Sequence, residues 1–288
     1  MPAYLRKNMT EAILRASGRG PFPIANTRRE DGPRWGEYAA SFLLLVTLLG
    51  FAEIAARNGW VSKLVMPAPS QVWEVLVDGF STGFYQPHLM STVGSIFTGF
   101  AIAGTAAILI AGTLASVPVL ERVLTPFFVA FQSMPKVALA PLIVIWFGFG
   151  GLSKIIIVIT ACFFPILMNA LHGLKLRDRD HLELMRSLGA TRMQLFLRLR
   201  LPHALPYIFA GLHIGVIFAL IGTVVAEFVG TNAGIGYVML QSKANFDIAS
   251  VYACLLLLMA IGVVLHAIMK QLEKRIAFWA QDISQVSA

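Results

Sequence analysis

The sequence predicts an all-α integral membrane protein with about six transmembrane helices. The 288-residue chain is 57% hydrophobic and only 13% charged, whereas a soluble domain has about 25% charged residues. Six apolar segments approach the length of about 20 residues that a helix needs to cross a bilayer. Both cysteines, Cys162 and Cys254, lie in such segments without disulfide or metal-ligand spacing, so we interpret them as core residues.

The predicted spans follow one another without room for a soluble domain. Their expected ranges are 38–56, 91–117, 123–147, 154–174, 205–229 and 249–269. The third range contains Pro126, Pro135 and Pro141, and a proline inside a helix removes a backbone donor and kinks the helix. Backbone groups freed at membrane depth are tolerated only against protein or around a cavity. We therefore expect the third span to line a pathway.

The distribution of Lys and Arg predicts the orientation. With six spans, both termini share one side with the segments 118–122 and 175–204, and that side holds most of the positive residues. The other side holds only Arg57, Lys63, Lys154 and Lys243. Cytoplasmic loops carry the excess of Lys and Arg, so both termini are expected in the cytoplasm. The net charge of +8 then reflects the orientation of the chain in the membrane, together with an attraction to anionic membrane lipid. It does not imply that the chain binds nucleic acid.

Domain organisation follows from these spans. Residues 1–37 are expected to form a cytoplasmic arm, residues 38–275 the transmembrane domain, and residues 276–288 a cytoplasmic tail. The first apolar run begins near Tyr38, which is too late for a cleavable signal peptide.

A polar, basic segment, 183–202, separates the fourth and fifth spans, although a plain connection could be much shorter. Its first residues are mostly strong helix formers, and Gly189 can adopt the left-handed conformation that ends a helix. Thr191 can cap a second helix, and Pro202 is expected to end the pattern before the next span. We predict two short helices with a bend between them on the membrane surface. The alternative is an amphipathic interfacial helix with no partner.

This segment resembles the "EAA loop" of binding-protein-dependent ABC transporter permeases. Glu183, Gly189 and Leu201-Pro202 keep the spacing of that loop, while Leu184 and Met185 replace its usual alanines with bulkier side chains. Two further runs, 131–148 and 226–237, resemble the nitrate, sulfonate, bicarbonate and taurine branch of these permeases. The resemblance covers about residues 65–275. It implies a type I ABC importer permease (MetI-like) fold with two permease copies around one pathway.

The resemblance also implies partners. Two copies of a separate cytoplasmic ABC ATPase, which carries the ATP and magnesium, are expected to dock on the coupling loop 181–202. The coupling residues would be Leu182, Glu183, Leu184, Met185, Arg186, Ser187, Leu188, Gly189 and Ala190. An extracytoplasmic substrate-binding protein would deliver a small anionic or polar solute to this homodimer in a bacterial inner membrane. Candidate solutes are a sulfonate, nitrate, bicarbonate, an aromatic acid or a pyrimidine precursor.

The chain itself is expected to be a transport subunit rather than an enzyme. It has no G-x-x-x-x-G-K-[ST] phosphate loop, and we expect no catalytic residue, cofactor or metal in it. A second hypothesis is an ion-coupled secondary transporter or channel without an ATPase, which predicts more acidic residues inside the spans than Glu227 alone. A membrane enzyme is a third, but no acid–base pair or metal site supports it.

Charged residues inside spans are costly, so they tend to be functional or paired. Lys136 lies in the middle of the third span, and Glu227 lies near the outer end of the fifth. We expect Ser133, Met134, Lys136 and Glu227 to line the translocation pathway. Lys136 would attract an anionic substrate or pair with Glu227. One alternative is that Glu227 is hydrated at the membrane interface. The other is that the Lys136 side chain extends to the membrane interface, where its ammonium group is hydrated.

Three glycines, Gly211, Gly215 and Gly222, share one face of the fifth span. Small residues at such spacing let helices approach closely. They predict either helix packing within one subunit or a dimer seam between two copies.

Overall fold

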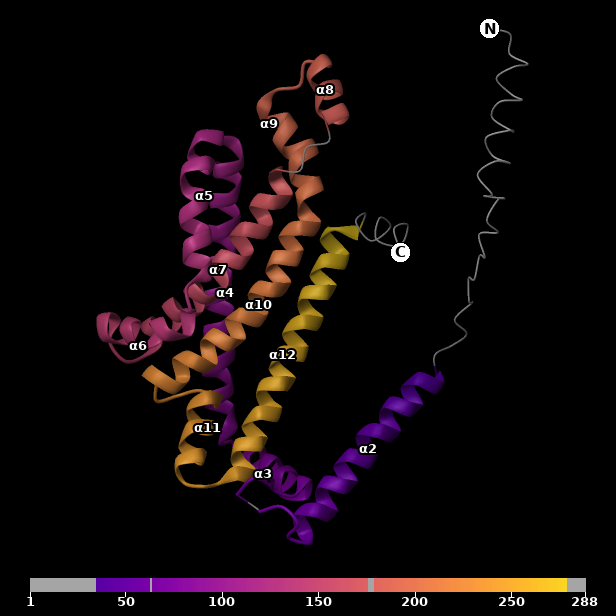
Figure 1. Cartoon of the computed structure of the whole chain (residues 1–288), viewed down its shortest axis with the longest axis vertical. Helices are drawn as coiled ribbons and strands as arrows, with labels where there is room; N and C mark the ends of the chain where they lie inside the picture. The colour runs from indigo at the N-terminus through magenta and orange to yellow at the C-terminus, as the bar shows by residue number, and fades with distance from the viewer. Residues whose placement is uncertain (1–34, 63, 176–178, 279–288) are drawn as a thin grey trace, which may run out of the picture. The chain divides into compact units, whose positions relative to one another are not determined.

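The computed structural model describes all residues except 1–34, 63, 176–178 and 279–288 (Figure 1). The arm 1–37 therefore lies almost entirely outside the described residues, as does most of the tail. Within the described part, the regular structure is entirely helical. Five of its helices are long and apolar enough to cross a membrane, and the number of spans is six if one bent helix pair counts as a span. The predicted all-α membrane architecture is confirmed.

Residues 1–50 and 51–288 form two separate units. α2 (Trp35–Arg57) supplies the described part of the first unit, and its side chains from Phe42 to Leu45 are exposed. In the second unit, the last turn of α2 connects to α3 (Pro69–Ser81). The Glu53 carboxylate accepts hydrogen bonds from the Ser70 N–H (3.0 Å) and hydroxyl (2.8 Å). These bonds fix the start of α3.

The core of the second unit is formed by α4 (Tyr85–Ser116), α7 (Gly151–Lys175) and α10 (Leu201–Gly230). α7 packs along both of the other helices. Small residues permit the close approach: Ala103, Ala107 and Ala111 of α4 are fully buried. The core is therefore built on short interhelical distances, as is common in membranes.

The three glycines predicted for packing or a dimer seam all face α7 of the same chain. A Cβ added to Gly211 would lie 2.8 Å from the Asn169 Cβ, and one added to Gly222 would lie 2.9 Å from the Ala161 Cβ. Gly215 faces Ile166 in the same way. These positions serve packing within one subunit, so the alternative of a seam at these glycines is corrected.

The third predicted span is a broken pair, α5 (Pro118–Ser133) and α6 (Lys136–Phe147), bent by 93°. The kink expected in this span is therefore a break between two helices. Met134 has extended backbone angles, φ −70° and ψ 135°, because the residue before a proline is disfavoured in the helical region. Pro135 also lacks an N–H, so the helix ends instead of bending.

The predicted bend between the fourth and fifth spans is confirmed. α8 (Arg179–Ser187) ends before Gly189, which has a φ of +77°. The Thr191 hydroxyl accepts the Gln194 N–H (3.3 Å), and the Gln194 amide oxygen accepts the Thr191 N–H (2.9 Å). This reciprocal capping box starts α9 (Arg192–Leu195).

The expectation that Pro202 interrupts the chain here is wrong. α9 continues through the π-helical turn η1 (Phe196–Arg200) into α10, and the stretch Met193–Gly230 forms one long apolar helix. The Leu201 N–H donates to the Phe196 carbonyl five residues back, and Pro202 follows directly after this π-helical turn. Such local adjustments accommodate a proline inside a membrane helix.

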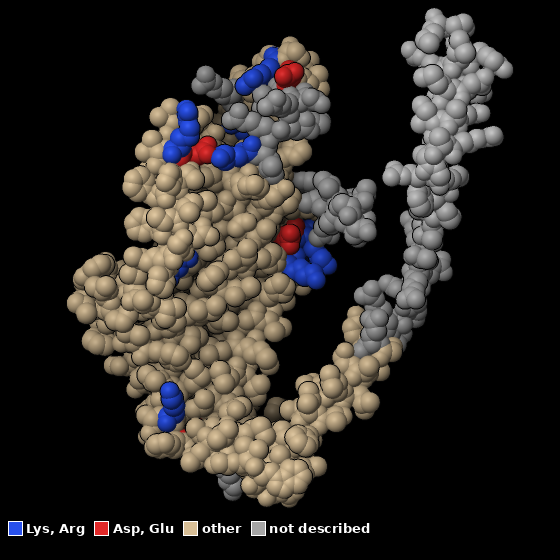
Figure 2. Space-filling view, viewed as in Figure 1, with Lys and Arg blue, Asp and Glu red and all other residues tan. Residues whose placement is uncertain are grey.

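The remaining helices are α11 (Ile235–Ala244) and α12 (Ile248–Ile276). Figure 1 shows that α3 and α11 lie at the opposite end of the second unit from α8 and α9. We call these the α11 end and the α8 end. α4 and α7 begin at the α11 end, and α10 finishes there. Figure 2 shows most of the charged side chains on this face in its upper half, toward the α8 end, and few in its lower half.

Candidate functional site

A cavity of about 340 Å³ lies beside the break between α5 and α6. It is lined by the end of α5, the start of α6, and the facing sides of α7 and α10, and it is partly open to the surroundings. Its polar lining residues are Gln132, Lys136 and Asn169, and its apolar ones include Ile214, Phe218 and Val225. We call it the Lys136 cavity. The break between the two helices therefore lies beside a cavity, where non-helical backbone inside a membrane is tolerated.

Lys136 is the cation of this cavity. Its Nζ lies 5.3 Å from the centre of the Phe218 ring and 5.9 Å from that of Phe164, within range of cation–π attraction. Its one described hydrogen bond, to the Ala161 carbonyl, is long at 3.5 Å. None of the ion pairs between described residues includes Lys136. Because Lys136 also begins α6, the positive end of that helix dipole lies at the same place.

The other two residues predicted beside Lys136 have different positions. Met134 lines the cavity. Ser133 is exposed and does not line it; its hydroxyl donates to the Val129 carbonyl (3.0 Å) within α5. The structure therefore brings Met134 and Lys136 together and leaves Ser133 outside.

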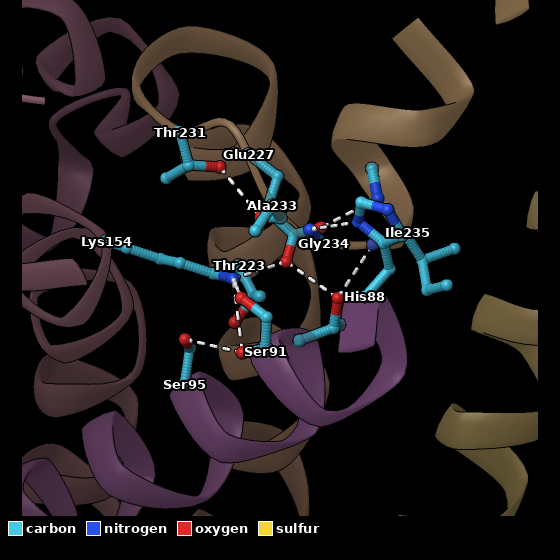
Figure 3. A network of polar contacts seen from close by, with 12 residues as sticks. His88, Ser91, Ser95, Lys154, Thr223, Glu227, Thr231, Ala233, Gly234 and Ile235 are labelled. Carbon is cyan, nitrogen blue, oxygen red and sulfur yellow. Dashed lines mark hydrogen bonds and ion pairs between the residues drawn. The ribbon is translucent and has the colours of Figure 1, made fainter. Parts of the chain in front are cut away.

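Glu227 lies near the α11 end and is 1% exposed. Its Oε1 lies 2.6 Å from the Nζ of Lys154, which is equally buried, and accepts the Thr92 hydroxyl (2.7 Å). Its Oε2 accepts the Gly236 N–H (2.7 Å). Figure 3 shows Lys154 reaching from α7 to this carboxylate. Glu227 is therefore neither hydrated at an interface nor paired with Lys136, and both of these alternatives are corrected.

The contacts of Glu227 extend into a wider polar network, which we call the Glu227 cluster. Lys154 also donates to the Ser91 carbonyl (3.2 Å) and hydroxyl (3.1 Å). The Ile235 N–H donates to the Thr92 hydroxyl (2.9 Å), and the Gly234 N–H donates to His88 Nδ1 (3.1 Å) (Figure 3). The cluster thus ties α4, α7 and α10 to the turn that starts α11.

Gly234 is required by this turn. Its φ of +129° is a conformation that side chains rarely adopt, and a Cβ there would overlap the Glu227 carboxylate. The turn can approach the charge closely because glycine carries no side chain.

Lys154 is the residue of this cluster that the sequence analysis does not identify. There it counts among the positive residues of the outer side, at the start of the fourth span, whereas the structure buries it inside α7, where it is 2% exposed. A usable signal was present: Lys154 opens the fourth apolar run at the same membrane level at which Glu227 closes the fifth. Buried opposite charges at one level of neighbouring spans tend to pair. Thr92 and Gly236 gave no comparable signal.

The predicted coupling residues lie on α8 and the bend that follows it, at the α8 end. Glu183 is exposed, and Leu184 and Leu188 are 57% and 73% exposed. Arg186, Ser187 and Gly189 are also exposed, whereas Met185 and Ala190 are half-buried. The side chain of Leu182 lies outside the described residues. Met193 on α9 is 66% exposed, so large apolar side chains face outward on both sides of the bend.

Comparison with known proteins agrees with this geometry. The model of the family "Binding-protein-dependent transport system inner membrane component" matches residues 84–278. The chain is 35% identical to the formylaminopyrimidine transport permease protein ThiX of Halalkalibacterium halodurans, over 82% of this chain and 94% of the relative. It is 31% identical to the taurine transport system permease protein TauC of Escherichia coli, over 83% and 89%.

A solved structure of the MetNI methionine ABC transporter, in an inward-facing conformation, has the same fold. Its TM-score is 0.56 at 20% identity, and it covers 64% of this chain and 92% of the solved chain. The MetI-like fold expected from the sequence is confirmed. The chain therefore belongs to the family of binding-protein-dependent transport system inner membrane components, as an ABC transporter permease of the sulfonate, taurine and nitrate branch.

Proposed function

We propose that this permease works as a homodimer driven by two copies of a cytoplasmic ABC ATPase that dock on residues 182–190. The observation that carries the proposal is the exposed bend between α8 and α9. Leu184, Leu188 and Met193 are all more than half exposed there. Exposed apolar side chains grouped at one place mark a surface that another protein covers.

The membrane orientation and the outer partner belong to the same proposal. The α8 end faces the cytoplasm of a bacterial cell, and the chain lies in the inner membrane with both termini in the cytoplasm. An extracytoplasmic substrate-binding protein delivers the solute at the α11 end. ATP and magnesium are bound by the ATPase, and the permease itself needs no cofactor.

The solute is a small anionic or polar molecule. The relatives are named for a formylaminopyrimidine and for taurine, which supports a compact polar solute. Lys136 supports an anion, because a positive charge inside an apolar span attracts a negative one. Met134 and Lys136 would line the pathway beside the break in the third span. Glu227 would act on the pathway through the cluster that it holds together.

One continuous helix connects the coupling bend to the Lys136 cavity and the Glu227 cluster, and it can transmit a displacement between them. The stretch Met193–Gly230 begins next to the coupling bend, passes the Lys136 cavity at Phe218, and ends at Gly230, just beyond Glu227. When the ATPases close, they would push on α8 and α9. Because a helix transmits displacement along its axis, this push would reach the cavity and the Glu227 cluster together, and it would alternate access between the two sides.

The test is a charge reversal in the coupling segment. Glu183→Lys should insert and fold normally, but it should lose binding of the partner ATPase and ATP-dependent uptake in proteoliposomes. Glu74→Lys is the matched control, because Glu74 is also exposed but lies on α3 at the α11 end. Uptake and ATPase binding that survive in Glu183→Lys would contradict the proposal. Solute uptake by the permease alone, without any ATPase, would favour a secondary transporter or channel instead.

A further inference from the structure

We propose that His88 is a positioning residue at the outer opening of the permease, and that its protonation releases the turn that forms one side of this opening. The inference deepens the proposed function and rests on it for the orientation that places the α11 end outside. The expected consequence is a loss of transport when the outer side becomes mildly acidic.

A partly open pocket of about 270 Å³ lies at the α11 end, and we call it the outer pocket. One wall is the turn 231–233 between α10 and α11. The other walls are the start of α4 and the segment 149–151, where α7 begins. Lys154 also lines the pocket, so the pocket adjoins the Glu227 cluster. The position of the turn therefore helps to set the width of the outer pocket.

Side chains of the Glu227 cluster hold the α11 side of this turn. The backbone N–H groups at the start of a helix have no acceptor within the helix, and three of them here have a side-chain acceptor. The bonds run from Gly234 to His88 Nδ1 (3.1 Å), from Ile235 to the Thr92 hydroxyl (2.9 Å) and from Gly236 to Glu227 Oε2 (2.7 Å). Gly234 directly follows the pocket wall, so His88 holds the point where the turn joins α11 (Figure 3).

His88 differs from the other two acceptors in its exposure and its chemistry. Thr92 is fully buried and does not titrate, and Glu227 is 1% exposed with its charge paired to Lys154. His88 is half-buried, so protons reach it from water. Histidine is the side chain that ordinarily changes its charge near neutral pH. Mild acid therefore acts on His88 first among the three acceptors.

Protonation removes the acceptor that Gly234 uses. Nδ1 can accept an N–H only while it carries no proton, and both nitrogens of the charged ring are donors. The charged groups that act on the ring are Glu227 of α10 and Lys154 of α7, which already pair with each other. Tyr237 of α11 stacks on the ring, with the ring centres 6.3 Å apart. The charged ring would thus direct a second donor at the Gly234 N–H, and the turn would separate from α4.

Hydrogen–deuterium exchange of the full-length permease in lipid nanodiscs tests this release without solute, nucleotide or partner protein. The protection of the Gly234 amide is corrected for the intrinsic pH dependence of exchange. It is compared at about pH 8, where an ordinary histidine is neutral, and at about pH 5.5, where it is charged. We expect protection to fall about fivefold or more at the lower pH, because one hydrogen bond is lost. Peptides from the core helix α7 serve as the internal reference.

Two variants and a control assign the pH response to His88. His88→Asn places an amide oxygen close to the position of Nδ1 and does not titrate, so it should keep the turn protected at both pH values. His88→Leu has no acceptor and should show low protection at both. His172→Asn changes an exposed histidine in the last turn of α7 and should keep the pH response of the natural protein. Size-exclusion profiles show whether each variant is folded.

The assembled transporter tests the consequence for transport. ATP hydrolysis by the complex with the ATPase and the outer binding protein is measured for the natural protein and for His88→Asn. The ratio of the two rates cancels the pH dependence of the ATPase itself. We expect this ratio to be about one at about pH 8 and to fall at least about twofold at about pH 5.5.

Three results would overturn the proposal. Equal protection of Gly234 at both pH values would show that the bond to His88 survives. A pH response that persists in His88→Asn would assign the response to another group. A constant ratio of hydrolysis rates would separate the turn from transport. Because exchange needs no ATPase, the release of the turn can be confirmed while the Glu183→Lys test of ATPase docking fails, and the reverse also holds.

Discussion

Lys136 and Lys154 are both set in apolar helices of one membrane domain, yet their surroundings are opposites. Lys154 is 2% exposed and lies 2.6 Å from the Glu227 carboxylate. Lys136 lines a cavity and lies near two aromatic rings, and its one described hydrogen bond is long. The first charge is paired with a carboxylate, and the second has no ion-pair partner among the described residues. An intramembrane lysine is therefore informative about function only after its counter-charge has been located.

The Glu227 cluster behaves as a structural joint. Its carboxylate receives Lys154, the Thr92 hydroxyl and the Gly236 N–H, so nearly all of its hydrogen-bonding capacity is used. A buried pair of this kind contributes little net stability compared with apolar side chains, but losing one partner leaves a buried charge unpaired. The joint should thus be intolerant of single substitutions, whereas the Lys136 cavity should tolerate them.

The largest expected effect is that of Glu227→Gln, which leaves Lys154 charged and without its counter-ion. We expect the free energy of unfolding to fall by about 3–5 kcal/mol, measured by denaturation of the purified permease in detergent. The double variant Glu227→Gln with Lys154→Met removes both charges, and it should recover a large part of that loss. If the double variant were as unstable as the sum of the two single ones, the ion pair would not be the cause.

The next effect tests the turn that approaches the carboxylate. Gly234→Ala places a methyl group where Glu227 Oε1 lies, on a backbone with φ +129°. Such strain costs about 1–3 kcal/mol, and we expect a lower unfolding midpoint in the same assay. Gly94→Ala is the control: nothing lies within 4 Å of its added Cβ, so this change should be neutral or slightly stabilising. Equal effects of the two changes would show that the turn is not constrained.

A smaller effect is expected from the hydroxyl that bridges Glu227 and α11. Thr92→Val removes the donor to Glu227 and the acceptor of the Ile235 N–H, which should cost about 1–2 kcal/mol. Thr98→Val keeps the same change on α4, but the Thr98 hydroxyl bonds only the Gly94 carbonyl within its own helix and is exposed. A loss of stability in Thr98→Val as large as that in Thr92→Val would contradict a bridging role.

Features built by residues that are neighbours in the chain could be predicted from the sequence, whereas contacts between distant helices could not. The bend at Gly189 and the cap at Thr191 followed from the sequence, because the residues that build them are close neighbours in the chain. The pairing of Lys154 with Glu227 did not, since it depends on how α7 and α10 are aligned. The break at Pro135 could be predicted only in part. The prolines predict a disturbed helix, but the 93° bend depends on how α5 and α6 pack.

The smallest expected effect on stability is that of a substitution at Lys136. Its difference from the effect of Glu227→Gln tests whether the two intramembrane charges have different roles. Lys136→Met replaces an uncompensated cation in an apolar span with an apolar side chain of similar length. Because the charge has no ion-pair partner among the described residues, its removal strands no buried carboxylate, and the cost of holding it in the membrane disappears. Stability should stay within about 0.5 kcal/mol of the natural protein or rise, in the same denaturation assay that resolves Glu227→Gln. A loss comparable to that of Glu227→Gln would mean that Lys136, too, is a structural charge.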